Sequence, residues 1–422
     1  MTARLRSASK DTFRSLHTRN FRLFFAGQLV SQAGTWMQSV AIIWVVLDLT
    51  DNGLALGLVT AAQFLPLLLL GAWTGVLADR VDRHRMLIGT QIAFTVLATV
   101  FSFIVLTDRA TVAWMYGLSL VFGVITALDN PVRRVLVGEL VEPEDVPNAV
   151  GLNSAMMTGS RIFGPALAGA LIAGPGAGAC FVLNAASYVA VIGALLRMDR
   201  SSFHAAPPVG RAKGQVRSGL SYVWRTPDLR ASLLLVAVVG LAAFNFQVTL
   251  ALLAERTFHG SAGTYTLLFS VMSAGSMVGG LAVAHSRQVT MRQLVRAAAG
   301  LATSMLAMAL APNLWLAVVA ALPVGFSSIY LISGSNAVVQ LRADPRMRGR
   351  VLALYAMLFL GSTPIGGPIM GWLADVTNAR VAVAVGGVAT ALAAGWTAHR
   401  LRVDPGMAAA DERPHVEPAV AA

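Results

Sequence analysis

Long apolar stretches separated by short polar segments recur along most of the chain. Each stretch is close to the roughly 20 residues that a helix needs to cross a bilayer. Charged residues make up only 12% of the chain and hydrophobic residues 56%, whereas a soluble domain carries about 25% charged residues. The pattern therefore predicts an all-α integral membrane protein.

We predict twelve transmembrane helices in two six-helix halves. The spans cover approximately residues 21–47, 54–77, 86–106, 112–128, 149–172, 177–196, 231–253, 265–284, 294–310, 314–339, 351–374 and 381–397. The parts of the chain are a cytoplasmic arm (1–20), a first bundle (21–196), a cytoplasmic linker (197–230), a second bundle (231–402) and a cytoplasmic tail (403–422). An even number of spans places both termini on one side of the membrane.

The positions of the 32 Lys and Arg residues test this span count. Almost all of them fall on the side that holds both termini. Arg109, Arg256 and Arg380 fall on the opposite side, and Arg161 lies within a span. An excess of basic residues marks the cytoplasmic side, so we expect both termini in the cytoplasm. The net charge of +12 is thereby explained by topology, and no nucleic-acid partner is expected.

The linker and the N-terminal arm are the main polar segments. The first part of the linker contains Pro207 and Pro208, and for this part a disordered segment and an ordered one are equally good interpretations. The pattern of residues 216–224 favours a short helix in the membrane interface. The basic arm lacks an apolar core, so no cleavable signal peptide is expected. The single cysteine, Cys180, excludes an internal disulfide.

The two halves are weakly similar to each other. Gly164-Pro165 in the fifth span is matched by Gly367-Pro368 in the eleventh, and Gly280 occupies the place in the second half that Gly75 occupies in the first. Repeats of six helices with the same direction are typical of transporters whose halves rock about a central site.

A charged turn after the second span resembles the signature of the major facilitator superfamily, Gly-x-x-x-Asp-Arg-x-Gly-Arg-Arg/Lys. Gly75, Asp79, Arg80 and Arg83 match it, and Asp82 stands in place of the signature glycine. The residues that resemble the drug:proton antiporter branch, which contains macrolide and enterobactin exporters, are Arg19-Asn20-Phe21-Arg22, Asp129-x-Pro131-x-Arg133, Asn148-Ala149, Arg161-x-x-Gly164-Pro165 and Arg348-Gly349-Arg350. The similarity extends over almost the whole chain and implies the major facilitator fold.

The resemblance implies a cytoplasmic gate. In the family, the aspartate matching Asp79 caps the eleventh helix, where the helix dipole favours a carboxylate. The arginine matching Arg83 pairs with an acid on the fourth helix, for which Asp129 is the candidate. The residues assigned to the gate are Gly75, Asp79, Arg80, Arg83, Arg85, Asp129 and Arg133. The alternative is a solvated loop that only obeys the positive-inside rule.

Arg161 is the basic residue placed deep in a span, and such residues usually face a cavity and carry function. Ser154 and Thr158 share its helical face. Arg161 would bind an anionic substrate group or bias the proton affinity of a nearby acid. A structural arginine that bonds backbone carbonyls at the Gly164-Pro165 break is the equally weighted alternative.

Polar stripes on other spans extend this candidate path. Gln28, Ser31, Gln32, Thr35 and Ser39 share one face of the first span, and shorter stripes contain Asn245 and Asn336. The residues assigned to the substrate or proton path are Gln28, Gln32, Arg161, Asn245 and Asn336. For each stripe residue, a hydrogen bond between helices is the simpler interpretation.

The fifth span carries a candidate helix-packing motif. Gly164, Pro165 and Gly169 resemble the antiporter motif of this helix, which implies a bias towards export, although Ala170 stands where a second glycine is usual. A kinked packing site without such a bias is the alternative.

The sequence predicts a secondary transporter. No nucleotide-binding loop, metal-ligand cluster or activated nucleophile is recognisable, so no enzyme activity, cofactor or metal is expected. The resemblance implies a monomer in a bacterial inner membrane that exchanges protons for an amphipathic drug or siderophore. Too few acidic residues lie deep within the predicted spans for one of them to be assigned as the proton carrier. A solute importer of the same fold and a non-transporting receptor or scaffold remain alternatives.

Overall fold

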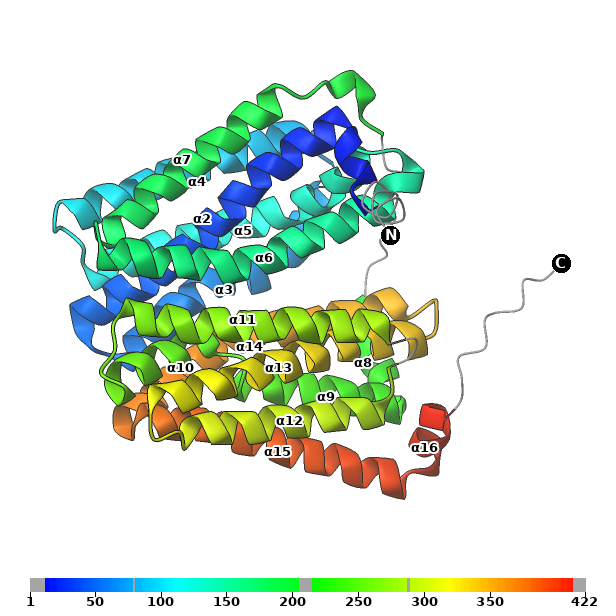
Figure 1. Ribbon diagram of the computed structural model, residues 1–422. Helices are drawn as coiled ribbons and strands as arrows, with labels where there is room; N and C mark the ends of the chain where they lie inside the picture. The colour runs from blue at the N-terminus through cyan, green and yellow to red at the C-terminus, as the bar shows by residue number, and fades with distance from the viewer. Residues whose placement is uncertain (1–11, 79, 205–214, 287–288, 413–422) are drawn as a thin grey trace, which may run out of the picture. The chain divides into compact units, whose positions relative to one another are not determined.

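The computed structural model is almost entirely helical and describes residues 12–78, 80–204, 215–286 and 289–412 (Figure 1). The long helices are α2 (Arg19–Thr50), α3 (Gly53–Ala78), α4 (Arg83–Leu106), α5 (Val112–Glu139), α6 (Val146–Ala173), α7 (Ala177–Leu196), α9 (Pro227–Ala242), α11 (Ala262–His285), α12 (Met291–Ala309), α13 (Leu314–Arg342), α14 (Arg348–Val376) and α15 (Ala379–Val403). The shorter ones are η1 (Arg14–His17), η2 (Pro143–Asp145), η3 (Arg200–Ser202), α8 (Gln215–Arg225), α10 (Phe246–Leu252), η4 (Leu253–Thr257) and α16 (Pro405–Glu412).

Within the described residues, 11 helices are long and apolar enough to cross a membrane. They correspond to eleven of the twelve predicted spans, which are thereby confirmed by length and composition. The span predicted at 294–310 coincides with α12, whose first two turns carry Arg292 and Arg296 and which is not among the eleven. The protein is thus a multi-pass all-α membrane protein, and α12 as a span stays a prediction.

The helices form two compact units. One unit contains residues 1–51, 58–210 and 261–270, and the other contains 52–57, 211–260 and 271–422. Relative to the six-and-six division drawn from the sequence, the first residues of α3 group with the second unit and the first residues of α11 group with the first. Two helices are therefore shared between the units.

Side chains at the loop ends fix where several helices begin. Thr111, Asn313 and Asn378 each accept a hydrogen bond from a backbone amide three residues further on, which satisfies one of the amides that a helix start leaves unpaired. Thr290 and Gln293 form a reciprocal capping box at the start of α12. These caps explain why short polar loops suffice between long apolar helices.

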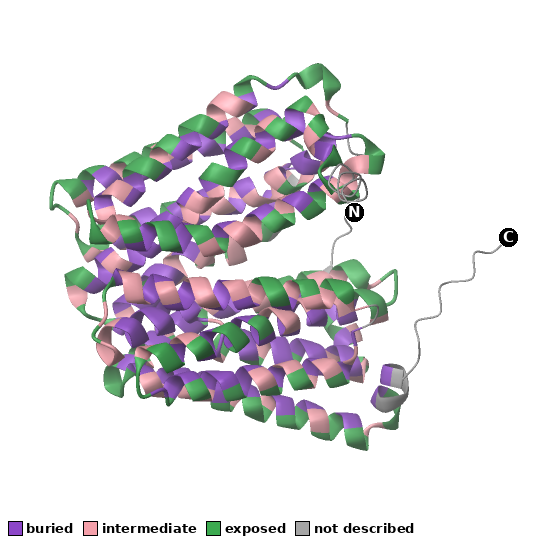
Figure 2. Ribbon diagram, viewed as in Figure 1, coloured by how far each residue is buried: buried purple, intermediate pink, exposed green. Residues whose placement is uncertain are grey.

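Large apolar side chains cover much of the outer surface. Buried and exposed residues alternate along the helices of both units (Figure 2), and exposed side chains include Leu69 (67%), Phe163 (65%) and Leu392 (70%). A soluble protein would not expose so many. Such a surface is suited to a lipid environment.

The charged C-terminal helix α16 is docked onto the second unit. Asp411 accepts hydrogen bonds from the amides of Met291 and Arg292 at the start of α12, at 2.5 and 3.3 Å. It also pairs at 2.8 Å with Arg342, which pairs with Asp228 at 3.2 Å. The described part of the predicted tail thus ties together the ends of α9, α12 and α13.

Candidate functional site

The hairpin between α3 and α4 is organised by Asp82, the residue that replaces the signature glycine. Its carboxylate accepts the Arg85 amide at 3.0 Å, which caps α4, and forms ion pairs with Arg85 and Arg200. Desolvation acts to raise the pKa of Asp82, but the Arg85 amide and the two cationic side chains outweigh it and hold that pKa below its usual value. Asp79 lies outside the described residues.

The acid that pairs with Arg83 is Glu139, not the expected Asp129. Arg83 begins α4 and Glu139 ends α5, and the two largely buried side chains form an ion pair. Asp129 lies ten residues before Glu139, which is about 15 Å along a helix at 1.5 Å per residue. Arg83 and Asp129 are therefore at different depths in the bundle, and this part of the predicted gate is corrected.

Asp129 instead belongs to a buried polar cluster in the first unit. Its Oδ1 accepts hydrogen bonds from Thr90 Oγ1 at 2.8 Å and from Gln91 Nε2 at 2.9 Å, both on α4. Its Oδ2 lies 3.4 Å from Arg133 Nε, one turn along α5. Asp129 is 4% exposed, so its charge depends on these partners rather than on water.

Arg133 connects this cluster to α2. Its Nη1 lies 3.3 Å from Gln28 Oε1, and its Nη2 donates to Asn130 Oδ1 at 2.7 Å. Gln32 Nε2 donates to the same Gln28 oxygen at 3.2 Å. Gln28 and Gln32, predicted for the substrate or proton path, are thus brought together with two residues predicted for the gate.

Three members of this region were missed by sequence reasoning. Thr90, Gln91 and Tyr188 are polar residues within apolar helices; the Tyr188 hydroxyl lies 3.0 Å from Thr35 Oγ1, and its ring stacks on Phe94 with centroids 5.0 Å apart. In the sequence, the adjacent polar residues Thr90 and Gln91 within an apolar span were the signal that could have indicated this cluster. Only the pairing of α4 with α5 shows that it faces Asp129.

Arg161 is exposed on α6, with its guanidinium carbon 5.1 Å from the centroid of the Trp36 ring. Trp36 in turn lies 5.9 Å from Phe269. Among the described residues, Arg161 has no carboxylate partner and no hydrogen bond to a backbone carbonyl. The contacts therefore favour a cation held over an aromatic ring rather than the structural role at the Gly164-Pro165 break.

The motif residues of α6 lie at close helix contacts. A side chain at buried Gly164 would place its Cβ 2.7 Å from the Ala33 carbonyl oxygen and 2.6 Å from Trp36 Cβ. A Cβ at Gly169 would overlap Thr266. Helix α6 continues through Pro165 without interruption. Gly164 and Gly169 thus have a definite packing role.

The remaining path candidates lie in the second unit. Asn245 is buried at the interruption between α9 and α10. Its Nδ2 donates to the Leu241 carbonyl at 2.8 Å, and its Oδ1 has no hydrogen-bond partner among the described residues. Asn336 accepts a hydrogen bond from Gln340 one turn further along α13. In this part of the structure Asn245 therefore presents a buried acceptor oxygen, whereas the Asn336 side-chain oxygen is bonded within its own helix.

The remaining gate candidates line the hairpin. Gly75 lies half-buried in the last turns of α3, Arg80 is exposed in the turn, and Arg85 is exposed on α4 beside Asp82. Within the described residues, no hydrogen bond or ion pair joins these three positions to the Asp129 cluster. The predicted gate set is therefore divided between the hairpin, which holds Arg83 with Glu139, and the deeper pair of Asp129 with Arg133.

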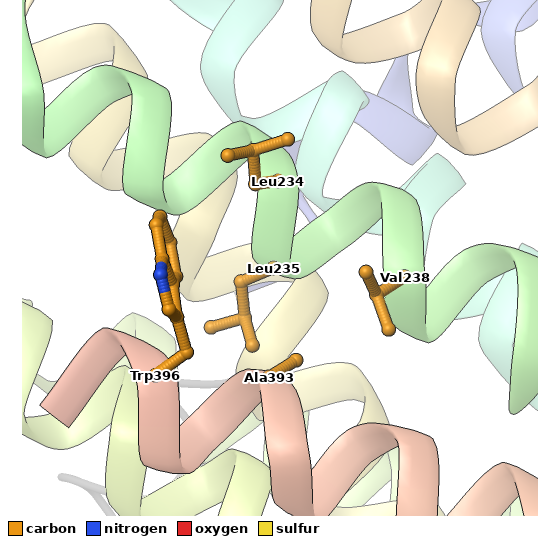
Figure 3. Close-up of a pocket in the computed structure, with 5 residues that line it drawn as sticks. All are labelled: Leu234, Leu235, Val238, Ala393 and Trp396. Carbon is orange, nitrogen blue, oxygen red and sulfur yellow. The ribbon is translucent and has the colours of Figure 1, made fainter. Parts of the chain in front are cut away.

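A groove of about 190 Å³ between α9 and α15 is lined mainly by apolar side chains. Figure 3 shows Leu234, Leu235 and Val238 of α9 facing Ala393 and Trp396 of α15. A second groove, of about 380 Å³, lies between α6 and the start of α11 and includes Thr266 and Ser270. The Trp396 indole nitrogen is the one polar side-chain group in the lining of the first groove. Over the described part of the chain, no cluster of His, Cys, Asp and Glu could hold a metal ion.

Comparison with known families gives one match over nearly the entire chain. The model of the family described as transmembrane secretion effector matches residues 10–422. The staphyloferrin A transporter of Staphylococcus aureus is 22% identical over 87% of this chain and 93% of its own length. The macrolide efflux protein A of Streptococcus pyogenes is 23% identical over 84% of this chain and 89% of its own. The multidrug efflux pump Tap of Mycolicibacterium fortuitum is 27% identical over the same shares.

Solved structures of transporters share the fold. A bacterial homolog of the human lysosomal transporter Spinster, inward-facing and unoccupied, has a TM-score of 0.73 at 15% identity, with 94% of this chain and 99% of that chain covered. A bacterial homologue of the iron transporter ferroportin, also inward-facing, has a TM-score of 0.69 at 16% identity, with 90% and 98% covered. At these identities the likeness establishes the fold alone.

Proposed function

Because the chain belongs to the transmembrane secretion effector family of the major facilitator superfamily, we propose that it exports an amphipathic organic compound in exchange for protons. The named relatives carry a siderophore, a macrolide or several drugs. A drug or siderophore is accordingly the proposed cargo class.

The observation that supports proton exchange best is the buried pair of Asp129 and Arg133. Ionisable groups inside a membrane span are costly and mark ion or substrate pathways. The other acids buried in the described structure, Glu139, Asp228 and Asp411, lie at helix ends and pair with arginines there. Asp129 lies well inside α5, and its nearest cation is 3.4 Å away. We therefore assign the proton to Asp129.

Protonation of Asp129 would release Arg133. The ionised carboxylate attracts the guanidinium and accepts hydrogen bonds from Thr90 and Gln91. A neutral Asp129 loses its attraction for Arg133, which then stays bonded to Gln28 and Asn130. Proton uptake thereby removes the ion pair within α5, while the bond from Arg133 to Gln28 still joins α5 to α2.

Efflux from loaded proteoliposomes under an imposed pH gradient tests this assignment, with a panel of antibiotics and siderophores as cargo. We expect Asp129→Asn to lose gradient-driven efflux while keeping exchange of labelled for unlabelled cargo, because exchange needs no net proton movement. Asp108→Asn, the same change at an exposed turn, is the matched control. Gradient-driven efflux by Asp129→Asn at the parent rate would refute the assignment.

The hairpin is proposed as the cytoplasmic gate of this exporter. Arg83 and Glu139 hold the start of α4 to the end of α5, and Asp82 and Arg200 hold it to the segment after α7. These ion pairs support a rigid cytoplasmic end for the first unit. The proposed setting is a bacterial inner membrane, with a monomer whose two termini are cytoplasmic. Protease accessibility of terminal tags in inverted vesicles tests that orientation.

A further inference from the structure

The carboxylate of Asp375, in the last turn of α14, holds the first turn of α3. Its Oδ1 accepts the Gly53 amide and its Oδ2 accepts the Leu54 amide, both at 2.8 Å. These amides have no acceptor within their own helix, since they belong to its first turn. Arg256 Nη1 also lies 2.9 Å from Oδ1. Each oxygen of Asp375 is therefore used to fix α3.

Opposed glycines bring the two helices close at the same place. Gly53 and Gly57 on α3 face Gly371 and Gly367 on α14, and a Cβ at Gly53 would lie 2.6 Å from the Gly371 carbonyl oxygen. A Cβ at Gly57 would overlap the Gly367 carbonyl. Small residues four positions apart on both helices allow backbones to approach. The Asp375 contact thus lies beside a close packing contact between α3 and α14.

This contact involves a segment that is set apart from the rest of its helix. Residues 52–57 group with the second unit, whereas α3 from residue 58 onward groups with the first. The corresponding segment of the second half, residues 261–270 at the start of α11, groups with the first unit. The two halves therefore exchange equivalent segments.

The two exchanged segments are held by different chemistry. The start of α11 is bound to α6 by neutral groups: Ser270 Oγ donates to the Ile162 carbonyl at 3.1 Å, and Thr266 packs on Gly169. The last turn of α6 contains no acid. The start of α3 is bound through a carboxylate aimed at a helix N-terminus, where the helix dipole strengthens the contact. Of the two exchanged segments, the start of α3 is therefore held more strongly by its partner helix than the start of α11.

We propose that Asp375, supported by Arg256, is a clasp that holds the start of α3 on α14 and controls opening at the end of the transporter opposite the hairpin. Any rearrangement that separates α3 from α14 must break both amide bonds and the arginine pair. Asp375 is thus a positioning residue of the transport cycle. The inference goes beyond the export proposal, because it concerns opening and not the cargo or the proton.

Cysteine labelling tests the clasp without any transported compound. Ala55, which is 8% exposed on the held segment, is changed to cysteine in a Cys180→Ser background and reacted with a membrane-impermeant maleimide from outside the cell. We expect Asp375→Ala to raise the labelling rate roughly tenfold, the order expected for loss of a helix cap. Asp375→Asn, which keeps one acceptor oxygen, should give a smaller rise and serves if Asp375→Ala does not fold.

Two controls separate a clasp from general loosening. Asp108→Asn, the same change at an exposed turn, should leave labelling at the parent rate. In a second version of the protein, which keeps Ala55 and the native Cys180, that cysteine is 0% exposed; it reports unfolding and should stay unreactive in Asp375→Ala. Unchanged labelling at position 55 in both Asp375 variants would overturn the proposal, as would an equal rise at Cys180. Since no cargo is used, failure of the export proposal leaves this result interpretable.

Discussion

Arg83 at the start of α4 forms an ion pair with Glu139 at the end of α5, and this pairing leaves Asp129 to interact with Arg133 deeper in the same helix. The two acids of α5 thereby have separate tasks. Glu139 joins two helix ends, whereas Asp129 lies in a polar cluster that reaches α2. This division leaves Asp129 available for the proton uptake that we propose.

The first prediction concerns the stability of the Arg83–Glu139 pair. Glu139→Ala should lower the free energy of unfolding by about 3 kcal/mol, because it leaves a largely buried arginine without its counter-charge. Thermal unfolding of the detergent-purified protein measures the effect. Glu144→Ala, at an exposed position, is the control. An Arg83→Gln and Glu139→Gln double-mutant cycle with no coupling would contradict the pairing.

The second prediction concerns acid stability through Asp82. Its folded-state pKa lies below the unfolded value, so Asp82 contributes stability that is fully present above about pH 4 and is lost as the pH falls through the folded pKa. We expect the thermal midpoint of Asp82→Asn to fall less between pH 6 and pH 3 than that of the parent. Equal pH profiles for the two proteins would show that the Arg85 amide and Arg200 do not stabilise the charged form.

The third prediction concerns Arg161. Because this side chain is exposed and has no carboxylate partner in the described structure, Arg161→Gln should keep the thermal midpoint close to that of the parent. Efflux of anionic cargo should fall about tenfold, equivalent to about 1.4 kcal/mol, and Arg161→Lys should retain part of it by keeping the charge. Loss of neutral and anionic cargo transport to the same extent would argue against an anion-binding role.

The fourth prediction concerns the contact between α6 and α2. Gly164→Ala should destabilise the protein by about 1–3 kcal/mol, since the new methyl group would overlap the Ala33 carbonyl and Trp36. Gly151→Ala, where a Cβ meets no atom within 4 Å, should be neutral or stabilising, because alanine favours a helix over glycine. The comparison of the two thermal midpoints is the measurement. Equal thermal midpoints would mean that α6 can shift to accommodate the methyl group without a loss of stability.

The sequence alone predicted the membrane class, the facilitator fold and the approximate spans, but it ended the fourth span too early. The predicted span stops at residue 128, whereas α5 continues to Glu139. Asp129, Arg133 and Glu139 lower the mean hydropathy of this stretch. A search for continuous apolar stretches therefore assigns it to a loop. Those charges remain in the helix because α4 and α2 supply their partners. A local hydropathy measure has no access to such partners.

The sequence by itself determined the properties that depend on residues close together in the chain. These are the apolar spans, the basic loops and the small residues of α6. Only the tertiary structure decided which charges meet, since the depth of each residue in a bundle depends on where two helices start and how they are rotated. Asp375 illustrates the difference. The sequence shows an acid near the end of a span, whereas the fold places its two oxygens on the amides of Gly53 and Leu54, more than three hundred residues away along the chain.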